Sequence, residues 1–143
     1  MYGIVVVSHG YLAKEALRTA TMIVGKISGK VAEASLVEGM PPQTFVDIVA
    51  KTIEEVYDDG GVLILTDLFG GSTTNFLASQ LRNKLRPELI GKVALISGFN
   101  LAMIISAITN NYTDATIHSF IDTIIGDSKD NIRNLTQYLN LPT

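Results

Sequence analysis

Cysteine is absent from the 143 residues of this chain. The absence excludes disulfide bonds, thiolate metal sites and thiol nucleophiles. Any chemistry must therefore come from histidine, carboxylate, hydroxyl, amine, guanidinium or backbone groups.

Charged side chains are also scarce, at 17% of the residues, and the 11 lysines and arginines are scattered along a chain of formal net charge -3. A protein that binds nucleic acid needs clustered basic side chains to neutralise phosphates. The sequence therefore argues against a nucleic-acid-binding protein.

Long apolar runs are missing as well. None approaches the roughly 18 residues that a membrane span requires, and the N-terminus lacks the pattern of a signal peptide. Hydrophobic residues make up 47% of the chain, and no linker, repeat or low-complexity segment interrupts it. We therefore expect residues 1–143 to form a single compact domain in the cytoplasm.

The chain does contain a regular alternation of short β-branched runs with longer segments of helical period. Strands are predicted at residues 4–8, 31–37, 62–66 and 92–97, each followed by a helix, with one or two more helices near the C-terminus. The alternation predicts an α/β fold: a doubly wound, mainly parallel sheet with helices on both faces. For its strand order we adopt the flavodoxin-like 2-1-3-4. The apolar positions expected to face the core from the helices are Leu12, Ala16, Ala20, Ile23, Val24; Phe45, Ile48, Val49, Ile53, Val56; Phe76, Leu77, Leu81, Leu85; and Ile117, Phe120, Ile121, Ile124, Ile125.

Three of the four predicted strands are followed by polar and glycine residues. These are residues 8–10 (SHG), residues 67–72 (DLFGGS) and residues 98–100 (GFN). In a parallel sheet, ligands bind beyond the carboxyl ends of the strands, where the strand order reverses. With the order 2-1-3-4, the first and third strands are neighbours, and His9 is predicted to face Asp67.

A histidine beside an aspartate has a defined chemistry. A carboxylate that accepts a hydrogen bond from one imidazole nitrogen fixes the tautomer and leaves the other nitrogen free as nucleophile, base or metal ligand. Residues 70–73 open the third helix, where free N–H groups, the helix dipole and hydroxyls form an anion site. The sequence thus predicts a nucleophile beside a cradle of phosphate size.

Each of these residues also has a simpler interpretation. A histidine after a strand is often a capping residue, Asp67 alone stabilises a loop, and Ser72 is an ordinary helix N-cap worth about 1 kcal/mol. The coincidence of all three at the carboxyl ends of one predicted sheet favours a functional site. His118, by contrast, is expected on the polar side of a helix as a solvated surface residue.

Other chemistries fit less well. The GGSTTN stretch lacks the lysine and the spacing of a P-loop, which argues against a nucleotide triphosphatase. No G-x-S-x-G elbow is present, so a hydrolase that uses Ser8 or Ser72 is a distant alternative. His9 and Asp67 are too few ligands for zinc, and we predict neither a metal nor a cofactor.

Four separated blocks carry a resemblance: GIVVVSHG, LRTATMIVG, LTDLFGGSTTN and ISGFNLAM. In order and spacing they resemble the enzyme IIA domain of the mannose family, from the bacterial phosphoenolpyruvate-dependent sugar phosphotransferase system (PTS). The resemblance implies a phosphocarrier, a phosphotransferase component rather than a metabolic catalyst. His9 matches the family's phosphorylated histidine, which accepts a phosphoryl group from the phosphohistidine of HPr and passes it to the IIB component during sugar uptake.

The resemblance also implies roles for the surrounding residues. Asp67 would orient the imidazole of His9. Phosphoryl oxygens would be bound by Ser72 and by the backbone around Gly10, Gly70 and Gly71. Phe69 and Asn100 are candidate partner contacts, although Phe69 fits packing beneath its loop equally well. The family forms homodimers with a contribution from the C-terminal region, and it approaches the membrane only peripherally, at the IIC/IID complex.

Two positions depart from the family pattern. Thr73 follows GGS where many relatives have proline, and Ala102 stands at a second proline position. Proline in the first turn of a helix is replaceable, so the phosphoryl role is expected to persist.

Two related functions stay open. One is a phosphocarrier subunit for dihydroxyacetone kinase, which shares the fold and the N-terminal histidine but whose loop resembles DLFGGSTTN less well. The other is a regulatory module whose phosphorylation state is read by a partner, although such modules usually sit inside larger transcription activators. The sequence does not indicate which sugar is transported, because a carrier that touches only protein phosphohistidines needs no sugar pocket.

Overall fold

A four-stranded sheet forms the centre of the protein, which a computed structural model describes over residues 1–142. The strand order is β2-β1-β3-β4, and every neighbouring pair is parallel. The predicted parallel sheet and its order 2-1-3-4 are therefore confirmed. The strands are β1 (Gly3–His9), β2 (Val31–Leu36), β3 (Val62–Thr66) and β4 (Val93–Ser97).

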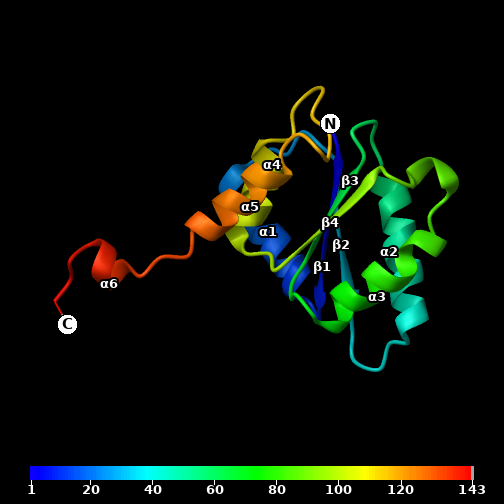
Figure 1. The fold of residues 1–143 in the computed structure, drawn as a ribbon, viewed down its shortest axis with the longest axis horizontal. Coiled ribbons are helices and arrows are strands. Elements are labelled where there is room, and N and C mark those ends of the chain that lie inside the picture. Colours follow the sequence, from blue (N-terminus) through cyan, green and yellow to red (C-terminus); the bar gives the residue numbers. More distant parts are fainter. Residues whose placement is uncertain (143) are drawn as a thin grey trace.

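Helices cover both faces of this sheet (Figure 1). On one face lie α1, α4 and α5, and on the other lie α2 and α3. The arrangement is the doubly wound one that right-handed crossovers between parallel strands produce. The helices are α1 (Leu12–Val24), α2 (Pro42–Val56), α3 (Ser72–Gln80), α4 (Leu101–Thr109), α5 (Ile121–Asp130) and the short α6 (Leu135–Tyr138), with 3-10 turns at Leu81–Asn83 and Pro87–Leu89.

The inner strands β1 and β3 are apolar along most of their length, and both of their faces are buried. Along β1, Ile4 and Val6 belong to the core beneath α1, α4 and α5, whereas Val5 and Val7 belong to the core beneath α2 and α3. A strand that is covered on both faces exposes neither face to solvent, so it does not alternate apolar and polar residues. This explains why the first strand reads as an unbroken run of β-branched residues.

The predicted helix faces have the right period but are wrong at their edges. Leu12 and Ile23 of α1 are 56% and 54% exposed, and Ile48 of α2 is 38% exposed. Helix α1 instead lies on the sheet through the small, fully buried side chains of Ala13 and Ala20. Its buried stripe is therefore rotated relative to the predicted one.

Two predicted helical segments are shorter than expected. Helix α3 ends at Gln80, so Leu85 lies outside it. Ile117 is buried but precedes α5, and its backbone N–H donates to the carbonyl of Gly60 at 2.9 Å. That bond joins residue 117 to the amino end of the sheet, and α5 begins only at Ile121.

The last described residues, 131–142, leave the body of the protein. All of them are exposed, and Figure 1 shows α6 well apart from the sheet and the other helices. Within residues 1–142, none of the helices combines the length and the apolar character that crossing a membrane requires.

The corrected face of α2 gives a stability test. Ile53 is fully buried and Ile48 is 38% exposed on the same helix. We expect Ile53→Ala to lower the free energy of unfolding by about 2–5 kcal/mol, because it opens a cavity in the core. The same change at Ile48 should cost less than about 1 kcal/mol. Urea unfolding of both variants measures this, and equal losses would contradict the assigned face.

Candidate functional site

The strand register brings His9 and Asp67 together. Val7 of β1 pairs with Thr66 of β3, so the two strands end at the same edge of the sheet. The backbone N–H of His9 donates to Oδ2 of Asp67 at 2.9 Å, and Nδ1 of His9 lies 2.7 Å from the same oxygen. This is the juxtaposition that the strand order predicts.

The carboxylate determines which imidazole nitrogen is free. An ionised carboxylate can only accept hydrogen bonds, so Nδ1 of His9 carries the proton and Nε2 keeps its lone pair. The side chain of His9 is 45% exposed, whereas that of Asp67 is 11% exposed. The site thus presents a partly exposed imidazole whose Nδ1 is held by a mostly buried carboxylate.

Asp67 stays ionised because its hydrogen bonds outweigh its burial. Burial raises the pKa of the Asp67 carboxyl, but the backbone N–H of His9, the ring of His9 and the hydroxyl of Thr73 all lower it. The net result is a pKa below the ordinary value of an aspartate. The donors therefore keep Asp67 in the form that accepts from His9.

The ring of His9 also lies against the start of α3. A Cβ built on Gly71, the N-cap residue of α3, would lie 3.1 Å from Cε1 of His9. The amides of Ser72, Thr73 and Thr74 follow in the first turn, where a helix offers no backbone acceptor. These N–H groups and the positive end of the helix dipole make this turn an anion site next to the imidazole.

Two glycines shape the turns on either side of the ring. Gly10 and Gly70 have φ values of 54° and 76°, the left-handed region that other residues rarely adopt. The amide of Gly10 donates to the carbonyl of Leu36 at 2.9 Å, and that of Gly71 to the carbonyl of Leu68 at 3.1 Å. The amides of Gly10 and Gly71 are thus engaged within the chain. Gly10 and Gly70 matter for the shape of the backbone, and Gly71 matters for its close approach to the ring.

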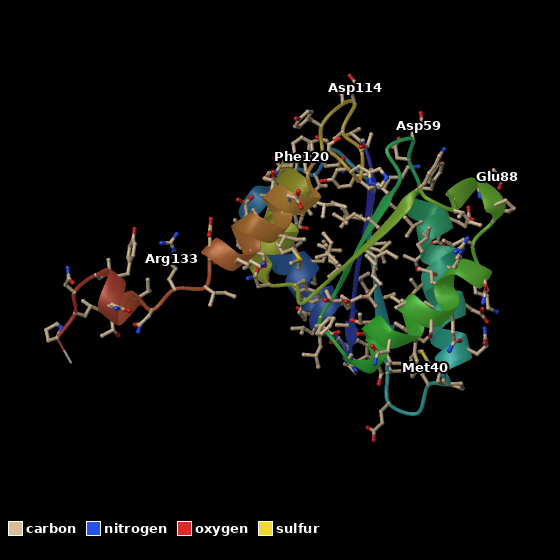
Figure 2. The ribbon with its side chains drawn as sticks, in the orientation of Figure 1. Met40, Asp59, Glu88, Asp114, Phe120 and Arg133 are labelled. Atoms are coloured by element: carbon tan, nitrogen blue, oxygen red, sulfur yellow. The ribbon has the colours of Figure 1, made fainter. Side chains whose placement is uncertain are left out.

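The two serines near His9 differ in access. Ser72 is the first residue of α3 rather than its N-cap, and it is exposed. Ser72 and His9 line a cleft of about 470 Å³ together with Phe76 and Met40. Met40 marks the position of this cleft in Figure 2, at the end of the molecule opposite Asp59 and Asp114. Ser8 is fully buried, and its Oγ accepts the amide of Ala13 at 2.7 Å. Ser8 is thus buried and engaged by an amide in the first turn of α1, which disfavours it as a hydrolase nucleophile.

The two predicted partner contacts, Phe69 and Asn100, have different environments. Phe69 is 85% exposed, so it does not pack beneath its loop. Asn100 is used within the fold: its Oδ1 accepts the amide of Met103 at 2.9 Å, and its Nδ2 donates to the carbonyl of Ser128 at 2.9 Å. The structure thus gives Asn100 the role of capping α4 and joining it to α5, and a partner contact at Asn100 stays a prediction.

His118 is exposed, as the sequence predicts, but it lies on the segment before α5 and not on a helix. Across residues 1–142, no three side chains of His, Asp or Glu gather closely enough to hold a metal ion.

The sequence predicts Thr73 only as part of the anion site at the start of α3, and it does not predict the role that this threonine has in the structure. Its side chain is fully buried, and its hydroxyl donates to Oδ1 of Asp67 at 2.7 Å. The further sequence signal at this position is that Thr73 stands where many relatives have proline. This departure does not predict a hydrogen bond to Asp67, six residues earlier.

The fold and the site define a class of protein: a parallel α/β domain that presents one carboxylate-oriented histidine at the carboxyl edge of its sheet. Comparison with known families is specific. The model of the EIIA-man family, described as the PTS system fructose IIA component, matches residues 3–125. The chain belongs to this family of PTS IIA components.

Solved structures of relatives share the whole fold. A PTS IIA protein associated with the fucose utilization operon of Streptococcus pneumoniae is 31% identical, with 96% of each chain covered and a TM-score of 0.78. The PTS component EIIA from Streptococcus agalactiae is 25% identical, with a TM-score of 0.79 over 96% of this chain and 99% of that one.

The chain is also similar to part of a longer curated protein. The PTS system mannose-specific EIIAB component of Escherichia coli (strain K12) is 24% identical over 132 residues, which are 92% of this chain. The chain spans 39% of the length of that relative.

The contact between Gly71 and the ring predicts a steric effect. Gly71→Ala should displace the imidazole, because the new Cβ would lie 3.1 Å from Cε1 of His9 and 3.2 Å from the carbonyl of Leu68. We expect the Nδ1 proton resonance of His9 in NMR spectra to shift or broaden. Gly126→Ala is the control, since a Cβ there meets nothing within 4 Å. An unchanged resonance in the Gly71 variant would contradict the close packing.

The lowered pKa of Asp67 predicts a dependence of stability on pH. A carboxyl group whose pKa is lower in the folded state than the unfolded value of 3.8 stabilises the fold at pH values above 3.8. This stabilisation is lost as the pH falls through the pKa of the folded state. Asp67→Asn should therefore be less stable than the native protein at about pH 5, and the gap should narrow toward about pH 3. Urea unfolding at both values measures the gap. A constant gap would show that Asp67 is not stabilised as an anion.

Proposed function

We propose that this protein is a PTS phosphocarrier that accepts a phosphoryl group from phospho-HPr on Nε2 of His9 and passes it to the IIB component during sugar uptake. The observation that carries the proposal is the setting of the imidazole. Its Nδ1 lies 2.7 Å from Oδ2 of Asp67, and its Cε1 edge faces Gly71 at the start of α3. Membership of the PTS IIA family supports it.

The proposed transfer balances without any further reactant. The lone pair of Nε2 attacks phosphorus, a P–N bond forms, and the P–N bond to the donor imidazole breaks with its electrons returning to that nitrogen. The phosphorylated ring of His9 keeps its proton on Nδ1 and so carries positive charge. The Asp67 carboxylate, 2.7 Å away, stabilises that charge.

The first turn of α3 supplies the other half of the proposed chemistry. Phosphoryl transfer depends on in-line positioning and on stabilising negative charge spread over the phosphoryl oxygens. The hydroxyl of Ser72 and the amides of residues 72–74 are the donors we assign to these oxygens. The backbone at Gly10, Gly70 and Gly71 permits the close approach, and transfer between two imidazoles calls for no metal or cofactor.

Partner proteins would reach His9 across an apolar surface. Tyr11, Leu68 and Phe69, in the turns that follow β1 and β3, are 66%, 58% and 85% exposed, and Leu12, the first residue of α1, is 56% exposed. Exposed aromatic and aliphatic side chains of this kind form the centres of protein interfaces. HPr and IIB would use this surface in turn, in the cytoplasm beside the membrane components of the transporter.

Intact mass after incubation with phosphoenolpyruvate, enzyme I and HPr tests the proposal. We expect one acid-labile phosphoryl group on the native chain and none on His9→Ala. His118→Ala is the matched control, because it removes the other histidine, which is exposed, and it should still be phosphorylated. A native chain that stays unmodified with competent HPr would contradict the proposed function.

We also propose that the protein forms a homodimer through residues 131–142. This segment exposes five large apolar side chains, Ile132, Leu135, Tyr138, Leu139 and Leu141, between 49% and 78%. In the body of the protein, β4 is an edge strand, and a groove of about 390 Å³ runs between β4 and α5 with a lining that includes Leu95, Ile121 and, at the start of the segment, Ile132. A second copy of the segment would cover this apolar surface.

Light scattering tests the dimer. The native chain should have about twice the mass of 15.4 kDa. Leu135→Glu combined with Leu139→Glu should give the mass of a single chain, because the charges oppose burial of the segment. Ile90→Glu, at an exposed apolar residue elsewhere, should leave the dimer intact. A monomeric native chain, or a dimer in the double variant, would contradict the assignment.

A further inference from the structure

Asp67 is held from both sides. Its Oδ2 accepts two hydrogen bonds from His9, one from the backbone N–H at 2.9 Å and one from the ring at 2.7 Å. Its Oδ1 accepts the hydroxyl of Thr73 at 2.7 Å. Because both carboxylate oxygens are engaged, the carboxylate plane has one favoured orientation relative to the imidazole.

The environment of Thr73 shows that this bond is not an incidental surface contact. The side chain is fully buried in the first turn of α3. A threonine in a helix often turns its hydroxyl to a nearby carbonyl of its own helix. Thr73 instead donates across the loop to Asp67, at the carboxyl end of β3.

The next residue anchors the same loop by separate bonds. The hydroxyl of Thr74 lies 2.8 Å from that of Thr66 and donates to the carbonyl of Leu68 at 2.8 Å. Thr74 thus fixes the backbone of the loop without touching Asp67 or His9. The two neighbouring threonines have distinct roles: Thr74 holds the loop, and Thr73 holds the carboxylate.

We propose that Thr73 is a positioning residue for His9: its hydroxyl fixes the Asp67 carboxylate in the orientation that keeps the proton on Nδ1 and the lone pair on Nε2. Without this bond the carboxylate can rotate away from the ring, and the Nε2–H tautomer, which has no lone pair to offer at Nε2, becomes populated. The consequence for phosphorylation rests on the proposed function, whereas the effect on the tautomer does not.

Thr73→Val tests the proposal, because valine has nearly the shape of threonine but carries a methyl group, which cannot donate a hydrogen bond, in place of the hydroxyl. Nitrogen NMR shifts of the neutral imidazole report the two tautomers directly. We expect the Nδ1–H tautomer of His9 to lose its dominance in Thr73→Val and to keep it in Thr73→Ser. The rate of phosphorylation by phospho-HPr should fall about tenfold in the valine variant, the size expected for one lost hydrogen bond to a charged group.

Thr74→Val is the matched control. It removes a hydroxyl from the same turn that does not contact Asp67, so the tautomer of His9 should stay as in the native protein. Thermal unfolding of each variant shows whether it is folded, and Thr73→Ala replaces Thr73→Val in the comparison if the valine variant does not fold.

The outcomes separate the two levels of the proposal. An unchanged tautomer in Thr73→Val, or an equal change in Thr74→Val, would overturn the positioning role. A shifted tautomer in Thr73→Val alone would support it even if the native protein accepts no phosphoryl group, a result that would count against the proposed function only.

Discussion

The hydrogen bond between Nδ1 of His9 and Oδ2 of Asp67 is the interaction on which the rest of the site depends. It exists because β1 and β3 are neighbours in a parallel sheet, so the two residues leave the same edge together. The packing of both faces of the sheet serves to hold that edge rigid. A side chain that is 45% exposed is thereby given a fixed orientation and a defined tautomer.

The start of α3 adds an electrostatic complement to this bond. Gly71 lets the helix come within contact of the ring, and the amides that follow are free of helical partners. The positive end of the helix thus lies at the Cε1 edge of the imidazole, and the carboxylate lies at Nδ1. A phosphoryl group on Nε2 would have its oxygens near the first and the charge of its ring near the second, which suits a carrier that must both accept and release the group.

Much of the fold and the centre of the site could be predicted from the sequence. The alternation of strands and helices predicts the parallel sheet, and with the flavodoxin-like strand order the residues after the strands predict the meeting of His9 with Asp67. The exposure of Leu12, Ile23 and Ile48 could not be predicted from periodicity. The period locates the apolar stripe of a helix, but it does not show which residues at the edge of that stripe the sheet leaves exposed. The bond from Thr73 to Asp67 escaped because it joins a helix to a loop by tertiary geometry, and no local pattern signals it.

The identity of the phosphorylated nitrogen tests the central claim most directly. Phosphorus and nitrogen NMR of the phosphorylated protein distinguish a phosphoryl group on Nε2 from one on Nδ1. Because the Asp67 carboxylate occupies the Nδ1 side of the ring at 2.7 Å, we expect the group on Nε2 with the Nδ1 proton retained. A phosphoryl group on Nδ1 would mean that the bond to Asp67 must break before transfer, and it would contradict the role of Asp67 in presenting Nε2 as the nucleophile.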